Sequence, residues 1–285
     1  MTKYFFCSGR TALYYGLKSL NLKKTDKVLI PEIICKEALL PFSKLNIGFK
    51  FYELKNDLMP NWKNINELNN KNVKAIMILH YFGFPNDINK FLNFKKLNNK
   101  IIIEDYCHGL GGFYKNKELG KIGDISITSP RKILKIPNGG VLRINNKKIK
   151  IIKEIKNISR EKISIFKFLV FKIKSNFFVI KLKRIFFNIF KFNFQNNSVK
   201  PKLVKKLVDK YSYKIIEENK FDYYRRYMKY LYIYKLLLKN QYEVIFKPNK
   251  KIIPWNVPFY VNPKKDYKKL SNFQKKNNFN IIQWP

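Results

Sequence analysis

The chain has 285 residues and carries 59 Lys and Arg against 19 Asp and Glu, so its formal net charge is +40. Its 16% aromatic content argues against intrinsic disorder, because disordered chains combine high charge with few aromatic residues. Three cysteines without a C-x-x-C pair exclude a disulfide scaffold and a structural zinc site, so we expect no metal and a reducing compartment. The first residues lack the apolar core of a signal peptide, and no apolar run reaches ~20 residues. We therefore expect a cytoplasmic protein without a membrane span.

The basic residues are spread along the whole chain and form no stripe or tail. Nucleic-acid-binding proteins usually concentrate their basic residues on one face or in one segment. We therefore expect most lysines to be solvated surface residues, with no specific nucleic-acid partner. A dispersed positive surface can still steer an acidic small molecule toward the protein over long range.

The first half of the chain has the pattern of an α/β domain. Ser8 is a good N-cap for a helix whose apolar residues recur at 13, 17 and 20. Short apolar runs then alternate with helical stretches such as Asp87–Leu97, which predicts a mostly parallel sheet with flanking helices. The predicted strands are Lys27–Pro31, Phe49–Leu54, Val73–His80, Lys100–Asp105 and Val141–Ile144.

From about Ile149 the composition changes, and residues 161–195 place basic residues every few positions among Phe, Ile and Leu. One interpretation is a pair of membrane-surface helices attracted to anionic lipid. The other is a helical excursion that packs on the body of the protein or on a second subunit. The second is favoured because the aromatic residues do not keep to one helix face.

The rest of the chain predicts a linker, a helix and a small α/β unit. The expected elements are a linker at Asn196–Pro201, a helix at Lys214–Asn240, a strand from Glu243, a helix at Lys264–Lys276 and a strand at Asn280–Gln283. We therefore divide the chain into a large domain at 1–148, a basic and aromatic excursion with its linker at 149–213, and a connecting helix with a small C-terminal domain at 214–285.

The ends of the predicted strands carry the polar residues. In a parallel sheet, ligands bind beyond the carboxyl ends of the strands. Asp105 follows a buried strand, Lys132 stands on a later loop beside Arg131, and Gly9 opens a helix whose free amides suit a phosphate group. An amine for an aldehyde, a carboxylate for a pyridine nitrogen and amides for a phosphate are the needs of pyridoxal 5′-phosphate (PLP).

Each of these signals is weak by itself. A lone aspartate at a strand end is more often a turn or capping residue, and Lys132 is one of 59 basic residues. The order and spacing of all three signals favour the cofactor site.

Five segments of the first 145 or so residues follow the order of one known family. They read CSGRTALYYGL, DKVLIPEIIC, ILHYFGFPNDI, IIIEDYCHGLGG and ELGKIGDISITSPRKILKIPNGGVL. On these segments the chain resembles the DegT/DnrJ/EryC1/StrS family of PLP-dependent sugar aminotransferases, of PLP transferase fold type I. FDYYRRYMKYL and IIPWNVPFYV are similar to that family's connecting helix and small-domain strand.

The resemblance implies roles for the catalytic residues. Lys132 would be the Schiff-base lysine and the general base, and Asp105 would pair with the pyridinium nitrogen of the cofactor. His108 stands where the family usually has a glutamine near the 3-oxygen of the cofactor.

The resemblance also implies the residues that bind the cofactor. Gly9, Arg10 and Thr11 correspond to the phosphate-binding turn, and Ser129 is a second phosphate donor. Cys35 stands where an aromatic residue commonly stacks on the cofactor ring.

The implied activity is transfer of an amino group from an amino-acid donor to a nucleotide-linked keto-sugar. The product would be an amino sugar for a surface polysaccharide or a secondary metabolite, and the family implies a homodimer.

The sequence also departs from the family pattern. An asparagine–aromatic–arginine–methionine motif has no match in Ile149–Lys200, and we expect a chain shortened at both ends. One alternative is therefore a degenerate, non-catalytic PLP-fold protein. A second is a basic protein that associates with membranes or polyanions, with peripheral membrane contact through residues 161–195.

Two further alternatives concern single side chains. Cys107 and His108 could form a thiol or metal cluster with Cys7 and Cys35, although buried cysteine usually packs as a small apolar residue. His80 could contact substrate, but it is more simply a strand-end histidine with satisfied hydrogen bonds.

Overall fold

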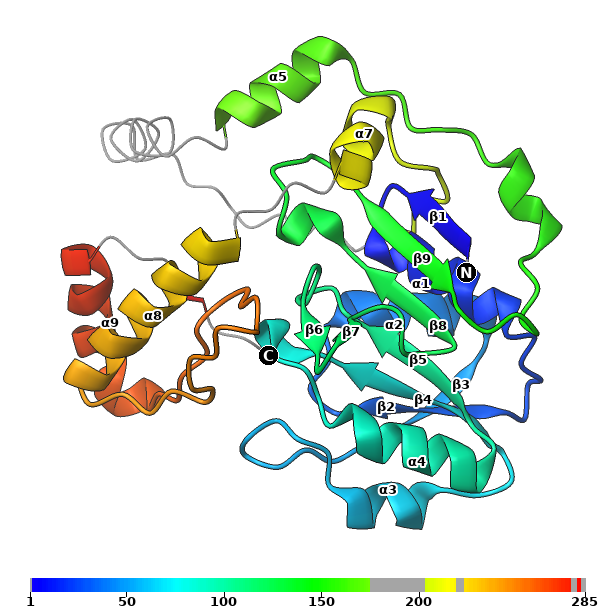
Figure 1. Ribbon diagram of the computed structural model, residues 1–285, viewed down its shortest axis with the longest axis horizontal. Coiled ribbons are helices and arrows are strands. Elements are labelled where there is room, and N and C mark those ends of the chain that lie inside the picture. The colour runs from blue at the N-terminus through cyan, green and yellow to red at the C-terminus, as the bar shows by residue number, and fades with distance from the viewer. Residues whose placement is uncertain (1, 175–202, 219–222, 278–280, 283–285) are drawn as a thin grey trace.

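The computed structural model describes residues 2–174, 203–218, 223–277 and 281–282 (Figure 1). A seven-stranded sheet forms the centre of the first half, in the order β1-β9-β8-β5-β4-β2-β3. Strand β9 runs antiparallel to both of its neighbours, and the other adjacent pairs are parallel. The predicted α/β fold with a mostly parallel sheet is thus confirmed. The strands are β1 (Thr2–Phe6), β2 (Lys27–Pro31), β3 (Gly48–Tyr52), β4 (Val73–Leu79), β5 (Ile101–Asp105), β8 (Ile125–Thr128) and β9 (Gly140–Ile144).

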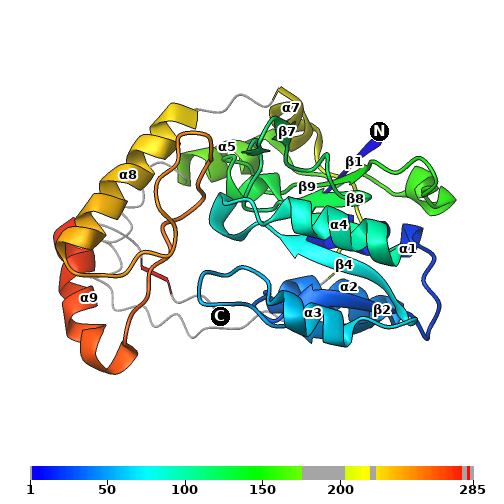
Figure 2. The ribbon, with the colours of Figure 1, turned by 60° about the horizontal axis from the view of Figure 1, so that its bottom comes forward.

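Both faces of the sheet are covered by helices. Successive residues of a strand point to opposite faces. Met77 of β4 accordingly packs in the cluster that contains α1 (Gly9–Ser19) and α2 (Lys36–Leu45). Its neighbour Ile78 packs in the cluster with α3 (Trp62–Leu68) and α4 (Ile88–Asn98). This two-sided burial explains why β4 and β5 read as nearly continuous apolar runs, and Figure 2 shows helices on both sides of the sheet.

Several elements of the large domain were not predicted. The N-cap residue of helix α2 is Cys35, whose side chain makes no capping hydrogen bond, so the usual start signal is missing. Pro41 lies inside the helix and interrupts its pattern. The short edge strand β1 and the hairpin β6 (Phe113–Tyr114) and β7 (Lys117–Glu118) were also missed. Two-residue strands leave almost no periodic pattern in a sequence. The 3₁₀ helices are η1 (Tyr81–Gly83), η2 (Pro130–Lys132) and η3 (Lys153–Asn157).

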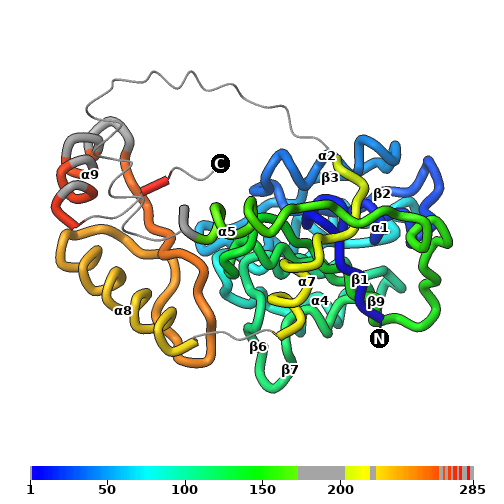
Figure 3. The backbone as a smooth tube through the Cα atoms, turned by 90° about the horizontal axis from the view of Figure 1, so that it is seen from above, coloured from blue at the N-terminus to red at the C-terminus, as the bar shows by residue number. Residues whose placement is uncertain are grey.

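The C-terminal part lies to one side of the sheet and sends one segment back to it. The predicted helix at 214–240 is instead α7 (Lys210–Glu218) and α8 (Tyr223–Lys239), on either side of residues that are not described. Helix α9 (Pro263–Asn277) confirms the next prediction, and α8 and α9 stand together in Figure 3. The strand expected from Glu243 is only a single bridge between Val244 and Phe259. Residues 281–282 form no strand, and the rest of the predicted strand at 280–283 lies outside the described residues.

Of the basic segment at 161–195, the structure describes the part up to 174. Helix α5 (Ile165–Lys174) buries Phe168 in a small cluster with Val208 and Ile216, which agrees with packing on the body of the protein. Phe166 and Leu169 remain exposed, at 75% and 49%. Residues 175–195 and the predicted linker at 196–201 lie outside the described residues. No helix in the described part of the chain combines the length and apolar character needed to cross a bilayer.

Candidate active site

The carboxyl ends of the central strands bring the predicted residues together. Strand β4 ends at Leu79 and is followed by His80, β5 ends at Asp105, and β8 is followed by η2, whose last residue is Lys132. Because these three strands are neighbours and parallel, their ends meet at one edge of the sheet. This edge is where the sequence places the ligand.

One cavity collects most of these side chains. It has a volume of about 60 Å³. The cavity is lined by Cys35, Leu79, His80, Asp105, Cys107, His108 and Lys132. Four of the eight predicted site residues, namely Cys35, Asp105, His108 and Lys132, therefore share one enclosed space, although up to 97 positions separate them in the sequence.

Asp105 is a buried carboxylate whose charge is poorly compensated. Its side chain is almost fully buried, and Oδ1 accepts the Cys107 backbone N–H at 2.9 Å. Burial raises the pKa of Asp105 above its ordinary value, although the nearby Lys132 charge acts in the opposite direction. No side chain in the described part of the chain forms an ion pair with it within 4.0 Å. A cationic N–H in the cavity would relieve this cost.

Lys132 also lines the cavity and contacts His108 and Trp255. Its Nζ lies 2.8 Å from His108 Nε2 and 5.1 Å from the centre of the Trp255 ring. The Trp255 ring stacks on the His108 imidazole at 4.0 Å, and its Nε1–H donates to the Lys132 carbonyl oxygen at 3.1 Å. Sequence analysis missed Trp255 as a site residue. The one sequence feature that pointed to Trp255 was its place in the segment IIPWNVPFYV. That segment does not predict a contact with Lys132, which lies 123 positions earlier in the chain.

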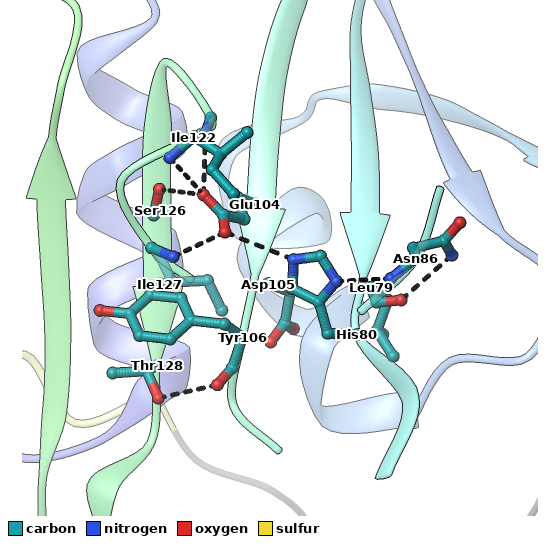
Figure 4. A network of polar contacts seen from close by, with 12 residues as sticks. Leu79, His80, Asn86, Glu104, Asp105, Tyr106, Ile122, Ser126, Ile127 and Thr128 are labelled. Carbon is teal, nitrogen blue, oxygen red and sulfur yellow. Dashed lines mark hydrogen bonds and ion pairs between the residues drawn. The ribbon is translucent and has the colours of Figure 1, made fainter. Parts of the chain in front are cut away.

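Glu104, the residue before Asp105, faces the opposite side of β5 and lies between His80 and the residues that lead into β8 (Figure 4). Its carboxylate accepts the backbone N–H groups of Gly120, Ile122 and Gly123 and the Ser126 hydroxyl. His80 Nε2 lies 3.3 Å from Glu104 Oε1. Burial opposes the charged form, but the hydrogen bonds outweigh burial and lower the pKa of Glu104 below its ordinary value. This carboxylate fixes the loop that leads into β8.

His80 has the structural role. Its Nδ1 accepts the Asn86 N–H at 3.0 Å, so the ring proton of a neutral imidazole lies on Nε2 and points at Glu104. The side chain is fully buried. Its ring also lines the cavity, yet both of its nitrogen atoms have protein partners.

The amino-terminal end of α1 lies beside the cavity. Gly9 packs closely here, because a Cβ there would stand 3.2 Å from Ser129 Cβ, a tight contact, and 3.7 Å from Cys107 Sγ. Gly9 and Ser129 are therefore neighbours of a cavity-lining residue, as a phosphate site would require. Ser129 Oγ itself donates to the Gly139 carbonyl oxygen at 3.4 Å.

The two other residues of the predicted phosphate turn differ in their surroundings. The Thr11 hydroxyl is buried and donates to the Val204 carbonyl oxygen at 2.6 Å, while its N–H donates to the Ser8 hydroxyl that caps the helix. Its hydrogen bonds are thus satisfied by a segment that sequence could not have paired with it. The Arg10 side chain is half-buried, and it forms no hydrogen bond or ion pair with any of the described residues.

The cysteines do not form the thiol or metal cluster considered from sequence. The described residues contain no group of three or more potential metal ligands. Cys7 donates its thiol to the Val204 carbonyl oxygen, outside the cavity. Burial and the neighbouring Asp105 raise the pKa of the Cys35 and Cys107 thiols, so both line the cavity as neutral groups.

The family model for DegT/DnrJ/EryC1/StrS aminotransferases matches residues 5–172, more than half of the chain. The chain belongs to this family. The matched range contains the sheet apart from the first three residues of β1, and it contains every predicted site residue. The resemblance inferred from sequence is confirmed. Trp255 and α8 lie outside it.

Two curated relatives and one solved structure illustrate the similarity to DegT/DnrJ/EryC1/StrS proteins. GDP-perosamine synthase of Escherichia coli O157:H7 is 27% identical over 146 residues, which cover 49% of this chain and 39% of the relative. An uncharacterized protein of Methanocaldococcus jannaschii is 34% identical over 166 residues, covering 52% and 40%. A structure of GDP-4-keto-6-deoxymannose-3-dehydratase with a trapped PLP-glutamate geminal diamine is 23% identical, covers 52% and 40%, and has a TM-score of 0.48. The chain spans about two-fifths of the length of these curated relatives.

The cofactor of the family is PLP, and the donor set of this cavity fits it. A buried carboxylate that makes no ion pair among the described residues suits a protonated ring nitrogen, and an amine in the same cavity suits an aldehyde. The helix terminus at Gly9, close to Ser129, suits a phosphate group.

Proposed function

We propose that this protein is a PLP-dependent aminotransferase that acts on a nucleotide-linked keto-sugar. The observation that supports this most directly is the shared cavity of Asp105 and Lys132, with the amino-terminal end of α1 beside it. Among the described residues Asp105 makes no ion pair, so the cavity leaves its carboxylate for a third, cationic group to compensate.

The residues would divide the work as follows. When bound, PLP supplies an aldehyde and an electron-withdrawing ring. Lys132 Nζ is the group that would hold the aldehyde and afterwards move a proton within the cavity. Asp105 would keep a proton on the ring nitrogen, since a carboxylate with little other charge compensation favours a cationic partner. Gly9, Arg10 and Ser129 would face the phosphate.

The substrate class comes from the relatives. Similar proteins include a GDP-perosamine synthase and a UDP-4-amino-4,6-dideoxy-N-acetyl-beta-L-altrosamine transaminase of Campylobacter jejuni, 28% identical over 150 residues. We extend to this chain a nucleotide-sugar substrate, an amino-acid donor and a homodimer. We also propose the three-part organisation at 1–148, 149–213 and 214–285, because Leu237, Tyr242 and Phe273 form a separate apolar cluster in the last part.

Cofactor trapping tests the proposal. The purified chain is incubated with PLP and reduced with borohydride, and the modified peptide is identified by mass spectrometry. We expect the label on Lys132 and its loss in Lys132→Ala. Lys135→Ala is the matched control, since Lys135 is an exposed lysine three positions away. Labelling that is spread over surface lysines, and unchanged in Lys132→Ala, would contradict the proposal.

A second measurement distinguishes an active aminotransferase from the degenerate, non-catalytic PLP-fold protein. A non-catalytic member would take up PLP on Lys132 but would not exchange an amino group with glutamate. We expect the bound cofactor to be converted when glutamate is added, followed by its absorption spectrum. Uptake without conversion would favour the non-catalytic protein.

A further inference from the structure

A short segment of the C-terminal part, at 253–255, lies against the candidate active site. The Trp255 backbone N–H donates to the Phe82 carbonyl oxygen at 2.7 Å, and its indole N–H donates to the Lys132 carbonyl oxygen at 3.1 Å. The indole ring stacks on the His108 imidazole at 4.0 Å, with an interplanar angle of 22°. Trp255 therefore contacts Phe82, His108 and Lys132 at the same time.

These three contacts are made with three different loops. Phe82 lies in η1 after β4, His108 follows β5, and Lys132 ends η2 after β8. Because β4, β5 and β8 are neighbouring parallel strands, the loops leave the sheet at the same edge. His108 and Lys132 line the cavity that Asp105 also lines. Trp255 thus joins the loops on which two cavity-lining side chains stand.

The segment around Trp255 is held by the large domain and by α8. Gly83, at φ +95°, allows the segment to approach the loop after β4, since a side chain there would collide with the Ile253 carbonyl oxygen. The Arg226 guanidinium of α8 donates to the Pro254 carbonyl oxygen at 3.4 Å. The place of Trp255 is therefore fixed by residues from both parts of the chain.

The loop of Lys132 receives donors from the C-terminal part. Helix η2 has only three residues, and the Lys132 N–H donates to the Ser129 carbonyl oxygen at 3.0 Å. Such a short 3₁₀ helix has few internal hydrogen bonds, so contacts from outside help to decide where it lies. The Lys132 carbonyl oxygen accepts the Trp255 indole N–H. The next carbonyl oxygen along the chain, that of Ile133, accepts from Arg226 at 3.2 Å.

We propose that Trp255 is a positioning residue of the active site. It holds the loops after β4, β5 and β8 in one arrangement, so that the His108 ring and the Lys132 side chain keep their places in the cavity. Trp255 lies outside the range that the family model matches, so residues 5–172 would not be sufficient to fix the site. The effect of Trp255 on cofactor binding rests on the proposed function. Its effect on the loops of the cofactor-free chain does not.

Hydrogen exchange of the full, cofactor-free chain tests the effect on the loops. Trp255→Ala removes the ring and the indole N–H, and we expect amide exchange to become about threefold to tenfold faster in the peptides that cover 106–110 and 129–134. Trp255→Phe keeps a ring that can stack on His108 but has no donor for the Lys132 carbonyl oxygen. It should speed exchange at 129–134 and leave 106–110 within about twofold of the wild type.

Phe259→Ala is the matched control for this experiment, because Phe259 packs on Tyr242 in the separate apolar cluster of the C-terminal part. It should leave exchange at 106–110 and 129–134 unchanged. Unchanged exchange in a folded Trp255→Ala, or an equal effect of Phe259→Ala, would overturn the proposal. If Trp255→Ala does not fold, exchange at 129–134 in Trp255→Phe decides it.

Cofactor affinity tests the effect on the site. The dissociation constant for PLP is measured by absorption titration of each variant, under conditions in which circular dichroism shows a folded chain. We expect Trp255→Ala to bind PLP about tenfold more weakly, because the side chains that would hold the cofactor are no longer fixed in place. Phe259→Ala should bind PLP as tightly as the wild type.

A residue that only adds to folding stability does not change the affinity of a chain that is already folded. Equal PLP affinity in Trp255→Ala would therefore overturn the positioning role. If the wild type takes up PLP on no specific lysine, the proposed function fails, and the exchange experiment alone then decides the role of Trp255.

Discussion

The Glu104→Gln substitution tests whether the buried carboxylate beneath the site holds the loop into β8. Glu104 is fully buried and accepts five hydrogen bonds. Oε1 accepts from Gly120 at 2.6 Å and lies 3.3 Å from His80 Nε2. The other oxygen accepts the remaining three. A glutamine has almost the same shape, but one of its two ends is a donor.

The expected loss follows from the number of donors left without an acceptor. If the amide nitrogen takes the place of Oε1, the Gly120 N–H and the His80 Nε2–H both face a donor. His80 cannot exchange its tautomer freely, because its Nδ1 already accepts the Asn86 N–H. Each buried unsatisfied donor costs about 1–3 kcal/mol, so we expect unfolding free energy to fall by about 2–6 kcal/mol.

Urea unfolding followed by circular dichroism measures this loss. The control is Glu154→Gln, which removes an exposed ion pair with Lys18 and should cost less than about 1 kcal/mol. A loss of unfolding free energy in Glu104→Gln no larger than in this control would refute the reasoning.

The pH dependence of stability gives a second check. The pKa of Glu104 is lowered on folding, so its stabilisation is present above the ordinary value of 4.5 and is lost as the pH falls through the lowered pKa. Glu104→Gln should flatten the acid side of the stability curve.

Three further substitutions have defined outcomes. Asp105→Asn should raise the free energy of unfolding of the cofactor-free chain at pH 7 by on the order of 1 kcal/mol, measured by urea unfolding, while lowering its affinity for PLP. The sign follows because burial raises the pKa of Asp105, so its stabilisation is present at low pH and is lost as the pH rises through the raised pKa. Gly83→Ala should cost about 1–3 kcal/mol, because φ is +95° and a Cβ would meet the Ile253 carbonyl oxygen; unchanged tryptophan fluorescence and stability would contradict this. Lys95→Met removes the 2.6 Å ion pair to the buried Asp124 and should cost about 1–3 kcal/mol without changing PLP uptake, measured by the same trapping assay.

Local pattern was enough to predict the central strands β4 and β5, but not their neighbour β8 (Ile125–Thr128). The segments at 73–79 and 101–105 are apolar on both faces because helices cover both sides of the sheet. Their nearly continuous apolar sequence predicts such two-sided burial without knowledge of the fold. The start of α1 was also predictable, because Ser8 is a favoured N-cap residue and its hydroxyl caps the helix. Helix α2 was not, because Cys35 offers no capping oxygen and Pro41 interrupts the pattern.

The sequence by itself determined the mostly parallel sheet and the order of Asp105 and Lys132 at its edge, because strand periodicity and the strand-end rule depend on neighbours in the chain. Only the tertiary structure decided that Trp255 covers His108, that the Val204 carbonyl oxygen accepts the Thr11 hydroxyl, and that the Phe82 backbone N–H lies 3.3 Å from His108 Nδ1. These contacts join residues between 26 and 193 positions apart. The residues around each partner do not predict these contacts. Packing and hydrogen bonds between distant elements form only when the chain folds and brings those elements together.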